Sequence, residues 1–344
     1  MKTCCVSPSC PFSLRITGPD PYAVQERKAM LKYIGKRLLQ SLLTLFIIVN
    51  VVFFLMRLMP EEGYFGEEYD KMDEAQIEAS LAAMGLRDPI PVQLLRYYGQ
   101  LLHFDFGRSI TVRPKVNISR IILQKAPYSI RFGLASILLS LVAGIPLGTV
   151  MALKKGKAAD KLGNGYIVII NAVPAAVYYL FIQLYGSGVF NLSILYNERD
   201  PISALLPIVS MSLGGTASYA MWTRRYVVDQ LNKDYVKFAR AKGISERKIT
   251  FGHMLRNALV PMAQNLPANI LLTISGSIYI ESLYSIPGMG NLLLSAISRQ
   301  DNPLVQALVL IYSSLGIFGL LLGDLLMVLC DPRIKLVRGK EAIS

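Results

Sequence analysis

Residues 38–56 read LLQSLLTLFIIVNVVFFLM, an uncharged apolar run that is long enough for one helix to cross a bilayer. A hydrocarbon core about 30 Å thick needs roughly 20 residues at about 1.5 Å each, and a helix satisfies its own backbone hydrogen bonds there. Five further stretches meet the same requirement. The sequence therefore predicts six membrane spans, over residues 38–56, 128–153, 162–185, 202–222, 259–280 and 304–330.

The composition agrees with a membrane protein. With 53% hydrophobic and only 17% charged residues, the chain is too apolar for an ordinary soluble domain. The net charge of +13 could suggest a nucleic-acid partner, but the basic residues flank the apolar runs on alternate sides, which indicates membrane topology. We expect an all-α, multi-pass membrane protein with both termini in the cytosol and no nucleic-acid partner. The predicted cytosolic segments hold 24 of the 36 Lys and Arg residues and cover 1–37, 154–161, 223–257 and 333–340.

The predicted spans also divide the chain into segments. Residues 1–30 are expected to be a disordered extension, or an over-extended start upstream of Met30. Three of the four cysteines lie within the first ten residues, so no disulfide framework is implied. The acidic segment that follows the first span should lie outside the cell with two short helices, which either shield the ends of the spans or contact a partner. The further segments are a first span within 31–60, the extracytoplasmic segment over 61–127, a core of five spans over 128–332, and a cytosolic tail over 333–344.

Three prolines interrupt the predicted spans and are candidate hinges. Pro174 lies in the third span, Pro207 in the fourth and Pro267 in the fifth. Proline frees a carbonyl group and kinks a helix, so such helices often line a cavity. Proline is also common in membrane helices generally, which leaves a purely structural role open at each position.

The loop over residues 223–257 is longer than a turn between two spans requires. Its spacing predicts a short helix from Asp234, a left-handed Gly243, and a second helix capped by Ser245. Glu246 would lie in the first turn of the second helix, where a negative charge is favourable. We expect a compact knob. Its small residues beside Phe238 would let it enter a groove in a partner, whereas its basic residues could serve only to hold the loop in the cytosol.

The sequence of this loop resembles a known family. The run DYVKFARAKGISERK at 234–248, continued by HMLRNALVP at 253–261, resembles the cytosolic signature loop of bacterial ABC importer permeases, in the dipeptide/oligopeptide/nickel branch. In the wider superfamily the loop begins Glu-Ala-Ala, where this chain has Lys237, Phe238 and Ala239, so no role for a glutamate carries over. The similarity covers roughly residues 30–338. Further similar segments are RLMP at 57–60, MGLRDPIPVQ at 84–93, FDFGRS at 104–109, SIPGMG at 285–290 and CDPRI at 330–334.

The resemblance implies a coupling helix that docks into a cleft of a separate ATPase subunit. It also implies a second homologous permease, two ABC ATPase subunits that bind ATP and Mg, an extracellular solute-binding protein, and a place in the bacterial cell membrane. Short peptides are the expected cargo, with nickel chelates, glutathione and oligosaccharides as alternatives. The positions that the resemblance assigns to the coupling loop are Asp234, Tyr235, Phe238, Ala239, Arg240, Ala241, Lys242, Gly243, Glu246 and Arg247.

No chemistry of its own is indicated for this chain. It has no Gly-x-x-x-x-Gly-Lys-Ser/Thr phosphate loop, so it is not the ATPase, and its two histidines lie far apart in the sequence, so no metal or catalytic site is expected. The rival hypothesis is an ion-gradient carrier or channel that acts without an ATPase. Such a carrier should show internal repeats and several ionisable residues within its spans, but only Asp324 stands out here.

Polar residues within the spans are the remaining candidates for function. Asp324 is expected to pair with a basic loop residue or to reach water rather than to contact cargo. Amide and hydroxyl side chains could line a polar path for a hydrated cargo, although the same types of side chain also form hydrogen bonds between membrane helices. The candidates for the translocation path are Asn171, Gln183, Gln264, Asn265, Asn269 and Ser275.

Overall fold

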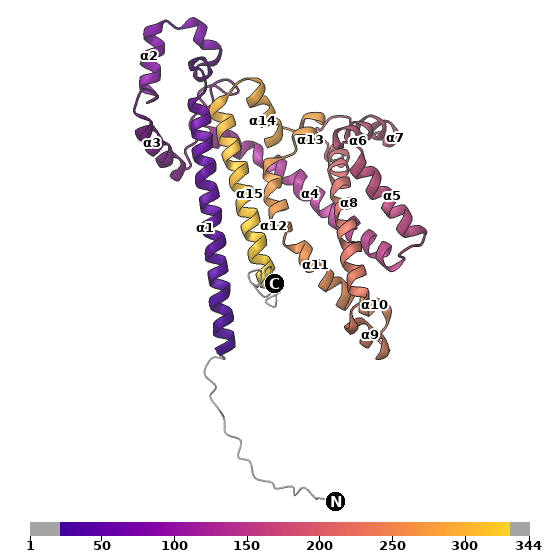
Figure 1. Cartoon of the computed structure of the whole chain (residues 1–344). Coiled ribbons are helices and arrows are strands. Elements are labelled where there is room, and N and C mark those ends of the chain that lie inside the picture. Colours follow the sequence, from indigo (N-terminus) through magenta and orange to yellow (C-terminus); the bar gives the residue numbers. More distant parts are fainter. Residues whose placement is uncertain (1–20, 331–344) are drawn as a thin grey trace, which may run out of the picture.

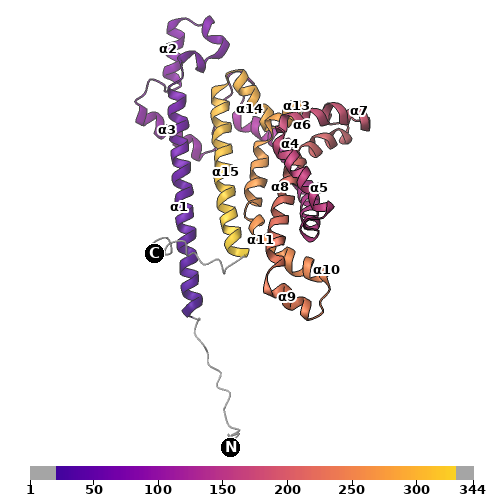
Figure 2. The same ribbon diagram turned by 45° about the vertical axis from the view of Figure 1, so that its right-hand side comes forward.

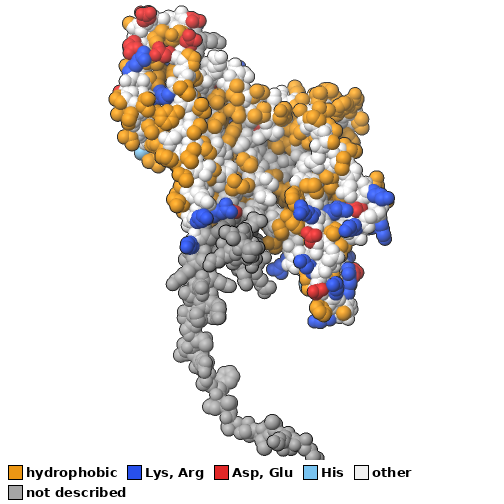
Figure 3. Space-filling view, viewed as in Figure 1, with side chains coloured by type: hydrophobic (Ala, Val, Ile, Leu, Met, Phe, Trp, Pro, Cys, Tyr) orange, Lys and Arg blue, Asp and Glu red, His pale blue; other side chains and the backbone are white. Residues whose placement is uncertain are grey.

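The computed structural model describes residues 21–330 of the protein, and within this range it contains helices and no strand (Figure 1). The expected cytosolic tail and most of the expected N-terminal extension lie outside the described residues. The first helix, α1 (Pro21–Arg57), begins inside that extension. The last ten residues of the expected extension, 21–30, are therefore helical. The long helices run between two ends of the molecule that differ in charge. Acidic side chains are concentrated at the α2 end, whereas Lys and Arg side chains predominate at the opposite end (Figure 3).

Six candidate membrane spans are present in the described range if one bent pair of helices is counted as a span. Their number and approximate positions agree with the prediction from the sequence. Two of them, the third and the fifth, are not continuous helices. The six are Ile34–Arg57, Ile118–Leu153, the pair Ala158–Ala172 and Ala175–Phe190, Pro201–Leu231, Leu266–Leu283 and Asn302–Leu326.

The third span differs from the continuous helix expected over residues 162–185. Helix α5 (Ala158–Ala172) ends at an extended Val173, and the chain then bends by 106°. Pro174 is the N-cap residue of the next helix. Proline disfavours the helical conformation in the residue before it, and Val173 directly precedes Pro174, so the sequence accounts for the position of the break. The chain continues through α6 (Ala175–Phe181), a π-helical turn η3 (Ile182–Gly186) and α7 (Ser187–Phe190).

The fifth span is also divided. A π-helical turn η5 (Ile249–Met254) leads into α11 (Leu255–Ala263), and α12 (Leu266–Leu272) follows after a break at Gln264 and Asn265. Pro267 lies in the first turn of α12, where a missing N–H group costs no hydrogen bond. Pro207 likewise lies in the first turn of α8 (Leu205–Leu231), which continues without a break. The fifth span ends with η6 (Thr273–Ser275) and α13 (Ile278–Leu283).

Two long helices of the bundle, α4 (Ile118–Leu153) and α8, pack closely because glycines face the contact. Helix α4 runs against α8, and a Cβ atom on Gly148 would lie only 2.3 Å from the carbonyl oxygen of Ala220. A Cβ atom on Gly144 would lie 2.8 Å from the carbonyl oxygen of Thr216. Small residues allow membrane helices to approach in this way. On the other side of the molecule, α15 (Asn302–Cys330) packs between α1 and α12 (Figure 2).

The segment after the first span forms a separate helical layer. Turns η1 (Glu61–Tyr64) and η2 (Gly66–Lys71) precede α2 (Glu74–Ala83) and α3 (Ile90–Leu102). Asp73 and Gln76 form a capping box at the start of α2, and Gly85 is left-handed with φ +72°. The Arg87 guanidinium bonds to Glu78, which lowers the pKa of that carboxyl group. The two short helices predicted from the sequence are therefore present.

A buried aspartate fastens this layer to the last span. The Asp301 carboxylate accepts hydrogen bonds from the Ser109 hydroxyl and from the backbone N–H groups of Ile110, Thr111 and Val112, at 2.5 to 3.2 Å. Its side chain has no exposed surface. A buried carboxylate is tolerated when donors surround it in this way. The loop before α4 is thus held at the start of α15.

A buried glutamate plays a similar part between the spans. The Glu281 carboxylate accepts hydrogen bonds from the Ser129 hydroxyl and from the N–H groups of Gly290 and Asn291, at 2.7, 2.7 and 3.0 Å, and a longer one from Ser277 at 3.3 Å. These donors come from α4, from the N-cap residue of α13 and from the first turn of α14 (Met289–Ser298). The carboxylate therefore joins α4, α13 and α14 at one point.

Candidate functional site

The knob predicted between the fourth and fifth spans consists of α9 (Asp234–Ala241), a left-handed glycine and α10 (Glu246–Lys248), and it projects from the basic end of the molecule (Figure 1). Gly243 has φ +70°, and the Ile244 N–H group donates to the carbonyl oxygen of Ala239 at 3.2 Å. This bond closes the end of α9 as in a glycine C-cap. Ser245 occupies the N-cap position of α10, but its hydroxyl group makes no capping hydrogen bond.

The base of the knob is built into the bundle. Val236 of α9 is fully buried and belongs to one core cluster with Ala152 of α4, Val227 of α8 and Ala258 of α11. Ile249 and Met254 of the π-helical turn complete the cluster. Because a close-packed core transmits displacement rather than absorbing it, a movement of α9 should reach all three helices.

The outer surface of the knob is free to meet a partner. Phe238 is 68% exposed, which is unusual for phenylalanine outside the apolar spans, and Phe251 in the adjoining turn η5 is 60% exposed. Arg240 donates to Glu246 at 2.6 Å across the glycine bend, which lowers the pKa of the Glu246 carboxyl group. Of the residues that the sequence assigns to the knob, Tyr235 and Ala239 face inward against the core cluster. The outward-facing ones are Asp234, Phe238, Arg240, Ala241, Lys242, Gly243, Glu246 and Arg247.

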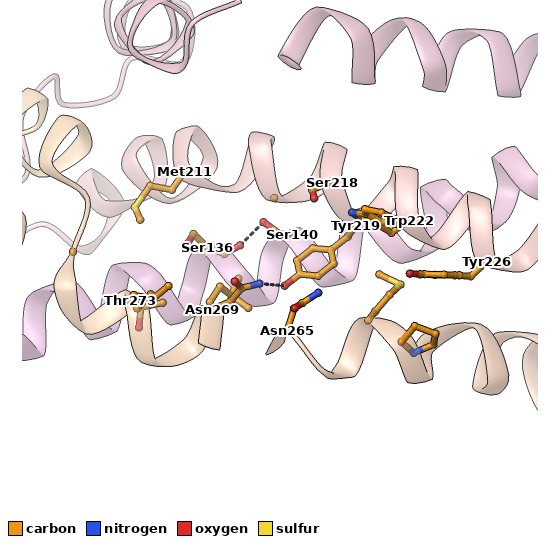
Figure 4. Close-up of a pocket in the computed structure, with 16 residues that line it drawn as sticks. Ser136, Ser140, Met211, Ser218, Tyr219, Trp222, Tyr226, Asn265, Asn269 and Thr273 are labelled. Carbon is orange, nitrogen blue, oxygen red and sulfur yellow. Dashed lines mark hydrogen bonds between the residues drawn. The ribbon is translucent and has the colours of Figure 1, made fainter. Parts of the chain in front are cut away.

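A second feature is a cavity of about 450 Å³ between α4, α8 and the divided fifth span (Figure 4). Asn269 donates to the Tyr219 hydroxyl group at 3.3 Å across it. Ser140 donates to the carbonyl oxygens of Ser136 and Ser212, at 2.7 and 2.9 Å. These bonds use the O–H donor of Ser140 and one N–H donor of Asn269. The lone pairs of both side chains and the second N–H group of Asn269 remain available to a molecule in the cavity.

Two of the six residues proposed for a path from the sequence, Asn265 and Asn269, line this cavity. The other four do not line it. Asn171 donates to the carbonyl oxygen of Ile167, Gln183 to those of Ile194 and Leu283, and Gln264 to the Asp324 carboxylate. The Ser275 hydroxyl group is buried and has no hydrogen-bond partner within the described residues.

Several lining residues were not singled out from the sequence, although signals for them exist. Ser136 and Ser140 are four residues apart on α4 and therefore share a face. Tyr219, Trp222 and Tyr226 follow one another at intervals of three and four on α8, which is the spacing of a helical stripe. The other lining residues are Ile137, Met211, Gly215, Ser218, Pro261, Met262, Leu272, Thr273 and Gly276.

Asp324 forms an ion pair, as expected, but with a helix rather than a loop. Its carboxylate lies 3.3 Å from Nε of Arg37 in α1 and accepts a hydrogen bond from Gln264 at 3.3 Å. The pair joins α1 and α15 beside the break in the fifth span. It does not face the cavity between α4 and α8.

A stronger ion pair lies near the base of the knob. Both Asp160 oxygens accept hydrogen bonds from Arg224, at 2.5 and 2.8 Å, and the carboxylate also accepts from the Gly156 N–H group and the Asn164 amide. The Asp160 side chain is 5% exposed and that of Arg224 is 27% exposed. This bidentate pair fixes the start of α5 against the end of α8, immediately before α9.

We expect Asp160→Asn to destabilise the protein by about 3 kcal/mol, because it leaves the Arg224 charge largely buried without its partner. A matched control is Asp234→Asn, which removes a carboxylate paired with Lys237 where both side chains are mostly exposed, and which should cost less than about 1 kcal/mol. Thermal unfolding of the detergent-solubilised protein measures both variants. Equal unfolding temperatures for the two would contradict the role given to the buried pair.

Comparisons with known proteins agree with this architecture. Residues 144–336 match the family described as "Binding-protein-dependent transport system inner membrane component", and residues 30–115 match the description "Binding-prot-dependent transport system membrane comp, N-term". The Lactococcus lactis subsp. cremoris protein "Dipeptide transport system permease protein DppB" is 32% identical over 309 residues, which are 89% of this chain and 100% of that protein.

Two further relatives carry oligopeptide names. "Oligopeptide transport system permease protein OppB" of Salmonella typhimurium is 31% identical over 315 residues, and "Oligopeptide transport system permease protein AppB" of Bacillus subtilis is 32% identical over 317 residues. Each alignment covers 89% of this chain and 100% of the relative. Among solved structures, a chain of the inward-facing MetNI methionine ABC transporter matches with a TM-score of 0.49 and 12% identity, over 62% of this chain and 97% of that one.

The family match covers more than half of the chain, and the three relatives named above match over their whole length. ATP hydrolysis in such an importer belongs to partner subunits. The chain belongs to the family of binding-protein-dependent transport system inner membrane components, as a multi-pass permease subunit of an ABC importer.

Proposed function

We propose that this permease forms half of the translocation path for short peptides. It would act with a second homologous permease, two ABC ATPase subunits and an extracellular binding protein that delivers the cargo. The names of the relatives support peptides as cargo. The observation that carries the mechanism is that α4, α8 and α11 both hold the base of the knob and contribute residues to the polar cavity.

The orientation follows from charge. The end that carries α9 and α10 is rich in Lys and Arg, which favours the cytosolic side of the membrane. The acidic layer of α2 and α3 then faces the outside, where the binding protein would dock. Helix α1 begins at the basic end and α15 ends there, so both chain termini belong in the cytosol.

The transport cycle uses the knob as the point where the ATPase acts. Closure of the two ATPase subunits around ATP and Mg would displace α9 and α10, and the shared core cluster would move α4, α8 and α11 together. The breaks beside Pro174 and Pro267 allow parts of a span to reorient without bending a continuous helix. A cargo-loaded binding protein shifts this equilibrium only if it binds one state more tightly than the other.

The assembled importer in proteoliposomes provides the test. With labelled dipeptides, we expect uptake that requires ATP, both ATPase subunits and the binding protein, and that persists when ionophores collapse the ion gradients. Uptake that is independent of ATP and follows an ion gradient would favour the carrier or channel instead. ATP-dependent uptake of a nickel chelate, glutathione or an oligosaccharide, without uptake of peptides, would retain the importer and change its cargo.

A further inference from the structure

We infer that the wall contributed by this chain does not distinguish peptides by the charge of their side chains. The inference rests on the proposed function, since it concerns the cavity that the cargo would pass. Within the part of the chain that the structure describes, all sixteen lining residues are uncharged. The same molecule carries 36 Lys and Arg residues and 23 Asp and Glu residues, so the neutral lining is a local property.

The polar groups of the lining suit a peptide backbone. Amide side chains (Asn265, Asn269) and hydroxyl groups (Ser136, Ser218, Tyr219) can each donate as well as accept hydrogen bonds. Every peptide presents the same N–H and C=O groups, whatever its side chains. The wall therefore offers partners for what all peptides share, and the rings of α8 add apolar surface (Figure 4).

The charged side chains near the cavity do not line it, and each has a partner within the chain. The Arg225 guanidinium lies over the ring of Trp222, 5.4 Å from its centroid. Glu281 lies behind Gly276, and its oxygens accept hydrogen bonds from four donors. Asp324 pairs with Arg37. None of these carboxylates lines the cavity, so a passing peptide meets no carboxylate of this chain there.

A fixed charge on the wall would have a large effect in this setting. Two unit charges about 8 Å apart interact by roughly 2 kcal/mol at an effective dielectric constant of about 20, which corresponds to about thirty-fold in rate or affinity. Such a charge would hold peptides of opposite charge and repel those of like charge. A path must bind its cargo weakly enough to release it, so a neutral wall allows peptides of either charge to pass.

The experiment compares peptides that differ only in charge. The complete importer in proteoliposomes is given Ala-Ala-Ala, Ala-Lys-Ala and Ala-Glu-Ala, each at saturating concentrations of cargo-loaded binding protein. We expect maximal uptake rates within about three-fold of one another. Asn269→Asp should raise the ratio of Lys-peptide to Glu-peptide uptake by about ten-fold or more, and Ser218→Lys should lower it by a similar factor.

Neutral substitutions at the same positions are the controls. Asn269→Ser and Ser218→Gln should leave the ratio unchanged even if the overall rates fall, and because the ratio is internal to each variant, a lower yield does not affect it. A wild-type ratio beyond about ten-fold, or unchanged ratios in both charged variants, would overturn the inference while leaving the proposed function intact. Absence of uptake for all three peptides would overturn the proposed function, and this inference with it.

Discussion

Gly243→Val should abolish peptide uptake while leaving the permease folded and inserted. Gly243 has φ +70°, a conformation that a β-branched residue adopts only with strain of about 1–3 kcal/mol. The cost is purely conformational, because a Cβ atom there would meet nothing within 4 Å. The strained bend would displace α10 from α9, so that Phe238 and Arg247 could no longer dock together.

The side chain at this position can be varied to separate backbone strain from bulk. Gly243→Asn should retain most of the transport, because asparagine tolerates the left-handed conformation, and Gly243→Ala should fall between the two. Uptake and the stimulation of the partner ATPase by loaded binding protein are measured together in proteoliposomes. Equal loss in the Asn and Val variants would show that the backbone conformation is not what matters, and normal uptake by the Val variant would refute the docking geometry.

Gly148→Leu should prevent the bundle from forming. A Cβ atom at this position would lie 2.3 Å from the Ala220 carbonyl oxygen and 2.8 Å from Cβ of Thr223. Both are parts of α8 that cannot move without separating two long helices, so we expect a cost at or above about 3 kcal/mol, the upper end of the usual range for overpacking. The folded fraction after solubilisation, measured by size-exclusion chromatography, should fall to near zero.

The matched control is Gly165→Leu, which adds the same side chain to α5. A Cβ atom on Gly165 meets nothing within 4 Å, and glycine is a poor helix former, so this variant should fold at least as well as the parent. If both leucine variants were equally folded, the close approach of α4 and α8 would not be a feature of the protein in solution. If both failed, the added hydrophobic surface rather than the contact would be responsible.

The sequence predicted those features that depend on local pattern. Six apolar runs predicted the spans, and the distribution of Lys and Arg predicted a topology. Gly243 predicted a left-handed bend, which the structure contains. The size of the 106° turn beside Pro174 was not predictable, because a proline permits a break without setting its angle. The hydropathy of the third span is the same whether the chain crosses the membrane directly or turns within it.

Polar residues were harder to assign because their roles depend on partners far away in the chain. Glu281 and Ser129 are 152 residues apart, and Asp301 and Ser109 are 192 apart, so no local signal distinguishes these buried carboxylates from exposed ones. Asn269 and Asn171 are the same residue type in similar surroundings, yet one lines the cavity and the other bonds to its own helix. The difference lies in where the helices pack, because α12 borders the cavity and α5 does not, and periodicity alone does not predict that packing.

The hydrogen bonds between Asp301 and the loop before α4 determine which substitutions this contact can accept. Three of its partners are main-chain amides, at Ile110, Thr111 and Val112, and any residue but proline supplies the same amide. The side chains at these three positions can therefore change without loss of the hydrogen bonds. Substitution of Asp301, in contrast, would leave all of its donors without their acceptor. Over evolutionary time we expect the two sides of this contact to accept mutations at very different rates.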